Sequence, residues 1–160
     1  VKEFFQPYVY LDRELIRKKG LEQGAVEQAV AEELEKFDGV AAAVSSTALR
    51  TGRLPDTLLM RSILRNFHPK RSGDIFLVFE PNIFINDFDG LEVASTHGSP
   101  WRYDTFVPVM FAGGGLQPKI VSRPVTPYDI APTLAARLGV KPPSAAVGHP
   151  LVEVLGESAD

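Results

Sequence analysis

The chain has 160 residues, a formal net charge of −3, 44% hydrophobic residues and 23% charged residues. This is the composition of a globular protein and not of a disordered one. The slightly acidic balance argues against a nucleic-acid binder held by phosphate contacts, and no apolar run approaches the roughly 20 residues of a membrane-spanning helix. Because the sequence has no cysteine, thiolate catalysis, disulfides and cysteine-ligated zinc are excluded.

The start of the chain is unusual. It begins Val1-Lys2-Glu3 and carries neither an initiator methionine nor the basic and apolar stretches of a signal peptide. We therefore expect that the natural start is missing and that the functional unit is longer than this chain.

The first half is predicted to alternate strands and helices. Short apolar runs predict strands at 8–11, 40–44 and 74–79, and 83–85 is a candidate for one more. Over 25–37 apolar residues recur at helical spacing, with Glu27 among the polar residues between them. The stretch 45–55 is polar and turn-rich. Asp56 is predicted to cap a second helix, which ends at His68 because Pro69 follows.

The second half begins with a predicted loop at 86–103, which is longer than compact domains usually leave without function or disorder. Val107–Phe111 has the pattern of a buried strand. Thr126 is predicted to cap a helix that stops at Gly139, and 151–155 to form a closing helical turn.

These elements predict an α/β to α+β fold, in which helices pack on a small mixed sheet. We divide the chain into a β-α-β-α-β subdomain at 1–85 and a second part at 86–160. The second part holds the long loop, one strand and the C-terminal helix.

The three histidines differ in their surroundings. His68 ends a predicted helix, where its charge favours the helix dipole, and His149 lies in a turn beside a proline-rich loop. His97 lies on the long loop between small residues, where a ligand or metal can approach, and neutral imidazole is the commonest metal ligand. A histidine without a second ligand two to five residues away is not a zinc signature. Spacing alone therefore leaves an ordinary loop histidine and a metal ligand both open.

Two stretches resemble a known family. Ser95-Thr96-His97-Gly98-Ser99-Pro100, with Tyr103-Asp104 and Val107–Gly113 after it, resembles the last metal-ligand segment of the alkaline phosphatase superfamily. The likeness is greatest to bacterial alkaline phosphatases of the type I phosphodiesterase/nucleotide pyrophosphatase branch. Val125–Ala135 is similar to the helix that follows in those enzymes and in sulfatases. The resemblance covers nearly the whole chain but only the C-terminal part of the family's α/β sandwich.

The resemblance implies a site in which two zinc ions clamp the attacking and leaving oxygens of a phosphoryl transfer. The Thr or Ser nucleophile, which forms a phospho-enzyme, and most metal ligands would lie on the missing N-terminal portion. His97 matches the last histidine ligand. Asp104 is expected to support the loop, and Phe106 stands where relatives often have a second histidine.

The expected parent is thus a zinc-dependent hydrolase of phosphate esters, periplasmic or secreted as its relatives usually are. The isolated chain is expected to be inactive and to bind no zinc tightly. Two alternatives stay open. A non-enzymatic α+β binding or structural module would use Trp101 and Tyr103 as exposed anchors, unless these rings pack under their own loop. The C-terminal part of a sulfatase would share the helix at 125–135.

Overall fold

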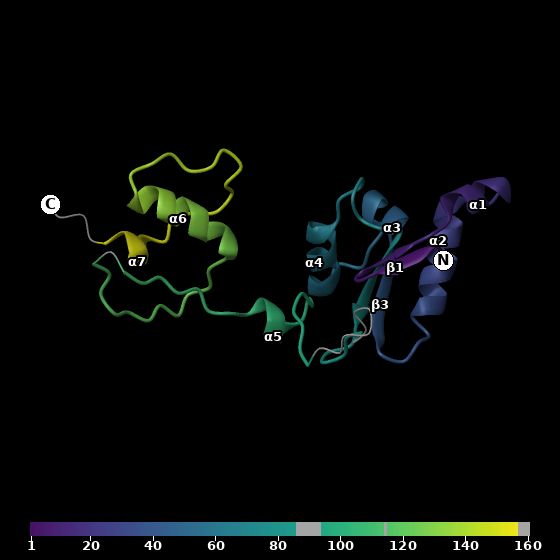
Figure 1. Cartoon of the computed structure of the whole chain (residues 1–160), viewed down its shortest axis with the longest axis horizontal. Helices are drawn as coiled ribbons and strands as arrows, with labels where there is room; N and C mark the ends of the chain where they lie inside the picture. The colour runs from purple at the N-terminus through teal and green to yellow at the C-terminus, as the bar shows by residue number, and fades with distance from the viewer. Residues whose placement is uncertain (86–93, 114, 157–160) are drawn as a thin grey trace. The chain divides into compact units, whose positions relative to one another are not determined.

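A computed structural model describes residues 1–85, 94–113 and 115–156 of the chain (Figure 1). Its contacts divide the chain into two compact units, Val1–Phe106 and Val107–Asp160. The boundary that we predicted after residue 85 borders on residues outside the described ones and stays a prediction. Within the described residues, no helix has the length and apolar character that a bilayer crossing requires.

The first unit contains a four-stranded sheet of β1 (Glu3–Phe5), β2 (Tyr8–Tyr10), β3 (Val40–Ser45) and β4 (Ile75–Phe79), in the order β1-β2-β4-β3. All its pairings are antiparallel, so the prediction of a mixed sheet was wrong. A tight turn joins β1 to β2, which requires antiparallel pairing. β4 begins beside Ser45, where β3 ends, so the chain re-enters the sheet at the end from which it left. The candidate strand at 83–85 is not formed.

The described residues of this unit form the helices α1 (Arg13–Lys18), α2 (Gln23–Leu34), α3 (Ser46–Thr51), α4 (Leu58–Asn66) and α5 (Arg102–Thr105). The predictions of α2 and α4 are confirmed, although Thr57 and not Asp56 caps α4. Asp56 instead binds Arg61 through both carboxylate oxygens, at 2.6 and 2.7 Å. The helix α3 replaces part of the irregular stretch that we expected. The Ser45 hydroxyl accepts a hydrogen bond from the Ala48 amide at its start, and Gly52 ends it in the left-handed conformation.

The sheet lies between α2 and α4 (Figure 1). Successive residues of a strand face opposite sides of the sheet, so β4 can contribute apolar side chains to both faces. Ile75 and Leu77 join one apolar cluster, with Val26 and Val30 of α2 packed against it. Val78 belongs to the cluster on the other face. That second cluster consists of Ala42, Val44, Leu49, Ile63 and Val78, with Trp101 packed against it.

Among the described residues of this unit, the carboxylates of Glu27 and Asp74 are buried. Glu27, which we placed among the polar residues of its helix, is fully buried. Its Oε2 accepts hydrogen bonds from the Thr47 amide at 2.9 Å and the Ser46 hydroxyl at 3.2 Å, so it satisfies the otherwise unpaired start of α3. Asp74 accepts the Leu11 amide at 2.8 Å and the Arg13 guanidinium at 2.6 and 2.9 Å. These bonds connect the sheet to its helices.

The second unit contains the short 3-10 turn η1 (Pro127–Asp129), α6 (Ile130–Arg137) and α7 (Val152–Leu155), as the sequence predicts. The strand predicted at Val107–Phe111 is wrong: these residues form no strand, and the side chains of Val107 and Met110 are 58% and 86% exposed. A strand requires a neighbour for its backbone groups, and the described residues of this unit offer none.

Candidate functional site

His97 lies on the irregular segment that leads into α5, and its imidazole is exposed. The next residue, Gly98, has a φ of 102°, a conformation that glycine adopts readily and that other residues avoid. The backbone therefore turns directly after His97. Because the next residue is a glycine, it has no side chain that could shield the imidazole. An ion in solution can reach this imidazole. The first part of the predicted loop, residues 86–93, lies outside the described residues.

The two aromatic residues after His97 attach this segment to the sheet. Trp101 is half-buried, and its Nε1 donates a hydrogen bond of 2.8 Å to the carbonyl oxygen of Phe79 at the end of β4. The Tyr103 hydroxyl accepts a hydrogen bond of 3.0 Å from the amide of Asn82. Trp101 thus packs under its own loop and is not an exposed anchor of the kind that the binding-module hypothesis requires, whereas Tyr103, the second anchor of that hypothesis, is 52% exposed.

Asp104 connects α5 back to the segment that carries His97. Its Oδ2 accepts a hydrogen bond of 2.8 Å from the Ser99 amide. The side chain and amide of Ser99 hold the pKa of Asp104 below its usual value, and the charge of His97 and the Gly98 amide lower that pKa further. Asp104 is therefore ionised at neutral pH and places a negative charge near His97.

At the position where relatives often have a second histidine, the structure shows a different interaction. The guanidinium carbon of Arg102 lies 4.7 Å from the centre of the Phe106 ring, which is the geometry of a cation–π contact. The Phe106 side chain itself offers no metal-binding atom.

The other two histidines have local structural partners. The Nδ1 atom of His68 accepts a hydrogen bond of 3.2 Å from the Lys70 amide, within the turn that follows α4. The His149 amide donates to Oδ1 of Asp129 at 2.9 Å in the second unit. In the part of the chain that the structure describes, no three His, Asp or Glu side chains are grouped so that they could hold a metal ion.

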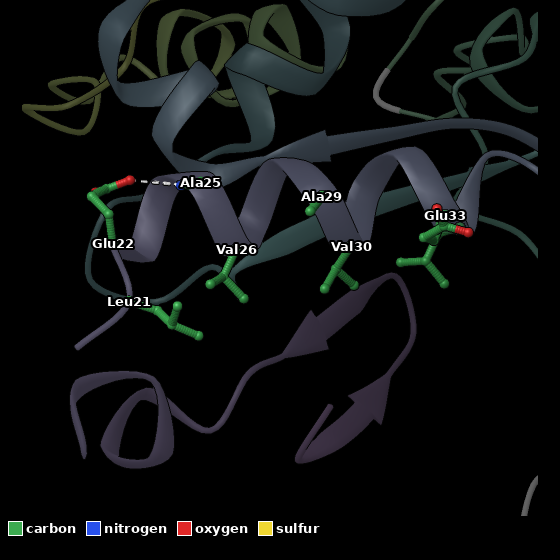
Figure 2. Close-up of a pocket in the computed structure, with 8 residues that line it drawn as sticks. Leu21, Glu22, Ala25, Val26, Ala29, Val30 and Glu33 are labelled. Atoms are coloured by element: carbon green, nitrogen blue, oxygen red, sulfur yellow. Dashed lines mark hydrogen bonds between the residues drawn. The ribbon is translucent and has the colours of Figure 1, made fainter. Parts of the chain in front are cut away.

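A separate hollow runs along one side of α2 and is lined by apolar side chains, with Glu22 and Glu33 at its margin (Figure 2). Val26 and Val30 project from this side of α2 toward the β1–β2 hairpin, and Leu21 lies on the segment that precedes the helix. The Glu22 carboxylate is already used, because it accepts the Ala25 amide at 2.6 Å and caps the helix. The hollow therefore brings together no catalytic groups.

Comparisons with known proteins point to one family. A calcium-transporting ATPase of Myroides odoratus is 35% identical over 155 residues, which are 97% of this chain and 28% of that protein. Alkaline phosphatase PafA of Elizabethkingia meningoseptica is 32% identical over 149 residues, 92% of this chain and 26% of that protein. A crystal structure of wild-type alkaline phosphatase PafA matches 95% of this chain, and 28% of its own, with a TM-score of 0.74 and 30% identity.

This chain is a partial homologue of the PafA/PhoV alkaline phosphatases. It spans little more than a quarter of the length of these relatives. Its helices and its four-stranded antiparallel sheet match part of the PafA structure, and no family model matches the chain. That the matched part is C-terminal stays a prediction.

The alkaline phosphatase homology implies metal-dependent relatives, and the residues present fit one place in a metal site. An exposed imidazole such as that of His97 suits a zinc ligand, because imidazole nitrogen is a preferred donor to zinc. The two hydrogen bonds that hold this loop, from Ser99 to Asp104 and from Trp101 to Phe79, were not predicted from the sequence. We considered Trp101 as a binding anchor or a packed loop ring, and the motif that we compared with family members contained Ser99 and Asp104 without indicating that they bind each other.

Proposed function

We propose that this chain is the C-terminal portion of a zinc-dependent phosphatase or phosphodiesterase of the alkaline phosphatase superfamily, and that it supplies His97 as a metal ligand. The observation that carries this proposal is the exposed imidazole of His97 on a loop held by Trp101 and Asp104, in a chain that matches PafA over 95% of its length. In the intact enzyme, two zinc ions would stabilise the attacking and leaving oxygens of phosphoryl transfer.

The ligand count explains why we expect the chain to be inactive alone. A zinc ion in a catalytic site takes about three protein ligands, so two ions need about six. The family resemblance matches one ligand to this chain, His97, and the described residues contain no group of three or more side chains that could hold a metal ion. The nucleophilic Thr or Ser and the remaining ligands would come from the portion that corresponds to the rest of the relatives' length, which would also complete the α/β sandwich.

The substrates that fit this proposal are phosphate esters, including the diesters that nucleotide pyrophosphatases cleave. A periplasmic or secreted location of the parent is supported by the family resemblance. The portion that corresponds to the rest of the relatives' length would be the partner on which activity depends.

A chimera tests the proposal directly. This chain replaces the matched segment of Elizabethkingia meningoseptica PafA, and p-nitrophenyl phosphate hydrolysis and bound zinc are measured. We expect zinc-dependent hydrolysis, and we expect His97→Ala to lower the rate by about 100-fold or more with loss of bound zinc, since ligands matter at least as much as their supporting residues.

The matched controls are His68→Ala and His149→Ala, which remove exposed imidazoles outside the loop and should retain activity and zinc. Equal rates and equal zinc content in the chimera with and without His97 would contradict the proposal. The isolated chain provides a second check: zinc-dependent turnover at an enzyme-like rate would show that the ligand count is wrong.

A further inference from the structure

We propose that Asp104 is a positioning residue, which shapes the loop around His97 before any metal binds by accepting a hydrogen bond from the Ser99 amide. This inference rests on the proposed role of His97 as a ligand. In this role the Asp104 carboxylate acts on the loop that carries His97 and does not itself need to contact zinc.

The first support is the tether itself. The Ser99 amide lies 2.8 Å from Oδ2 of Asp104, and both residues are only partly exposed. A hydrogen bond from a backbone amide to an ionised carboxylate is about twice as strong as one between neutral groups. The bond closes a short loop of backbone directly after His97.

The second support is that Asp104 is held in place from the sheet. The Asp104 and Thr105 amides both donate to the carbonyl oxygen of Trp101 at 3.0 Å. The Nε1 atom of Trp101 in turn donates a hydrogen bond of 2.8 Å to the carbonyl oxygen of Phe79, and the ring packs against the apolar cluster that contains Ile63. The carboxylate therefore sits at the end of a continuous set of contacts that starts in β4.

The third support is that the segment around His97, in the part that the structure describes, has few other restraints on its backbone. Residues 94–98 are exposed, and Gly98 is the residue with the greatest backbone freedom. A functional side chain has to be held within about 0.5 Å of its working position. The Asp104–Ser99 bond restricts the backbone on the C-terminal side of the glycine, and so limits the positions that the His97 ring can take.

The test uses the 160-residue chain as it is, without zinc. Amide hydrogen exchange at Ser99 and the NMR resonances of the three imidazoles are measured for Asp104→Ala, Asp104→Asn and Asp104→Glu. We expect Asp104→Ala to speed Ser99 exchange about tenfold and to shift the His97 resonances alone. Asp104→Asn keeps an acceptor without charge and should give an intermediate result, and Asp104→Glu should recover part of the protection.

The control is Asp56→Ala, which removes an exposed carboxylate of the same unit that binds Arg61. It should leave Ser99 and His97 unchanged. Trp101 fluorescence shows whether α5 remains attached, and if Asp104→Ala disturbs it, Asp104→Asn carries the comparison. Unchanged Ser99 exchange and unchanged His97 resonances in the variant with intact Trp101 emission would overturn the proposal.

A second readout separates this inference from the proposed function. In the PafA chimera, Asp104→Asn should weaken zinc binding about tenfold and leave kcat near normal at saturating zinc. If His97→Ala has no effect there, the proposed ligand role fails, while faster Ser99 exchange in the isolated chain still establishes the tether. If His97→Ala abolishes zinc binding and Ser99 exchange is unchanged, only the positioning role fails.

Discussion

The units Val1–Phe106 and Val107–Asp160 are stabilised by different means. The first has apolar clusters on both faces of a sheet. In the second, the buried side chains among the described residues are few: Pro132, Thr133, Ala135, Leu151 and Val154. Several large apolar side chains of this unit are exposed, including Ile120 at 95% and Leu138 at 74%. The contrast shows what a sheet contributes, since it provides two faces on which helices can bury apolar groups.

In the second unit, hydrogen bonds from a buried side chain to the backbone add to the small apolar core. The Thr133 hydroxyl donates to the carbonyl oxygen of Asp129 at 2.5 Å and accepts the Leu151 amide at 2.8 Å. Gly148 permits a further close approach, because a Cβ there would lie 2.1 Å from the carbonyl oxygen of Tyr128. The loop from α6 to α7 is therefore held by side-chain-to-backbone contacts. Loss of an apolar group should be most damaging in the first unit, and loss of a hydroxyl in the second.

The largest effect is expected for Ile63→Ala. This side chain is 1% exposed in the cluster between α4 and the sheet, and its truncation leaves a cavity. The free energy of unfolding of the first unit should fall by about 2–5 kcal/mol. Chemical denaturation followed by the fluorescence of Trp101, the single tryptophan of the chain, measures it. Leu64→Ala, on the same helix but 45% exposed, should cost much less, and equal losses would contradict an apolar core.

A smaller effect is expected for Thr133→Val, which preserves the shape of the side chain and removes the hydroxyl. The Leu151 amide then loses its acceptor, and an unsatisfied buried amide costs about 1–3 kcal/mol. Amide hydrogen exchange at Leu151 and Val154 should become faster, while Trp101 fluorescence stays unchanged. The control Val152→Ala removes methyl groups from a side chain that is 68% exposed. If Val152→Ala speeds amide exchange as much as Thr133→Val does, the Thr133 hydroxyl is not what stabilises the second unit.

The elements that could be predicted from sequence are those that local patterns determine. The run at 74–79 and the helix at 25–37 follow from periodicity, and the helix after Thr126 follows from its cap and proline. The strand at Val107–Phe111 was wrong because strand formation depends on a neighbour, which a local pattern does not reveal. Glu27 was misplaced for a similar reason: its partner, the Thr47 amide, lies 20 residues further along the chain.

The candidate site divides in the same way. His97 could be selected because a short motif surrounds it. The hydrogen-bond partner of the Trp101 ring could not be predicted, because it is a carbonyl oxygen 22 residues earlier, and the direction of an indole ring is set by packing. The role expected for Asp104, to support the loop, agrees with its bond to Ser99, although sequence alone did not name the atom that it holds.

The smallest effect concerns the ion pair of the second unit and its pH dependence. Arg123 donates to both carboxylate oxygens of Glu153, at 2.6 and 2.7 Å, and this bond lowers the pKa of Glu153 from 4.5 to about 2. A lowered pKa in the folded state means that the pair stabilises fully above pH 4.5 and that this contribution is lost as the pH falls from 4.5 toward 2. Because both groups reach solvent, salt weakens the effect. The protection of the Val154 amide, which is its exchange rate relative to the intrinsic rate at each pH, should therefore decrease slightly as the pH falls over this range. In Glu153→Gln this change should disappear, and an identical pH dependence in the two proteins would show that the second unit does not depend on this pair.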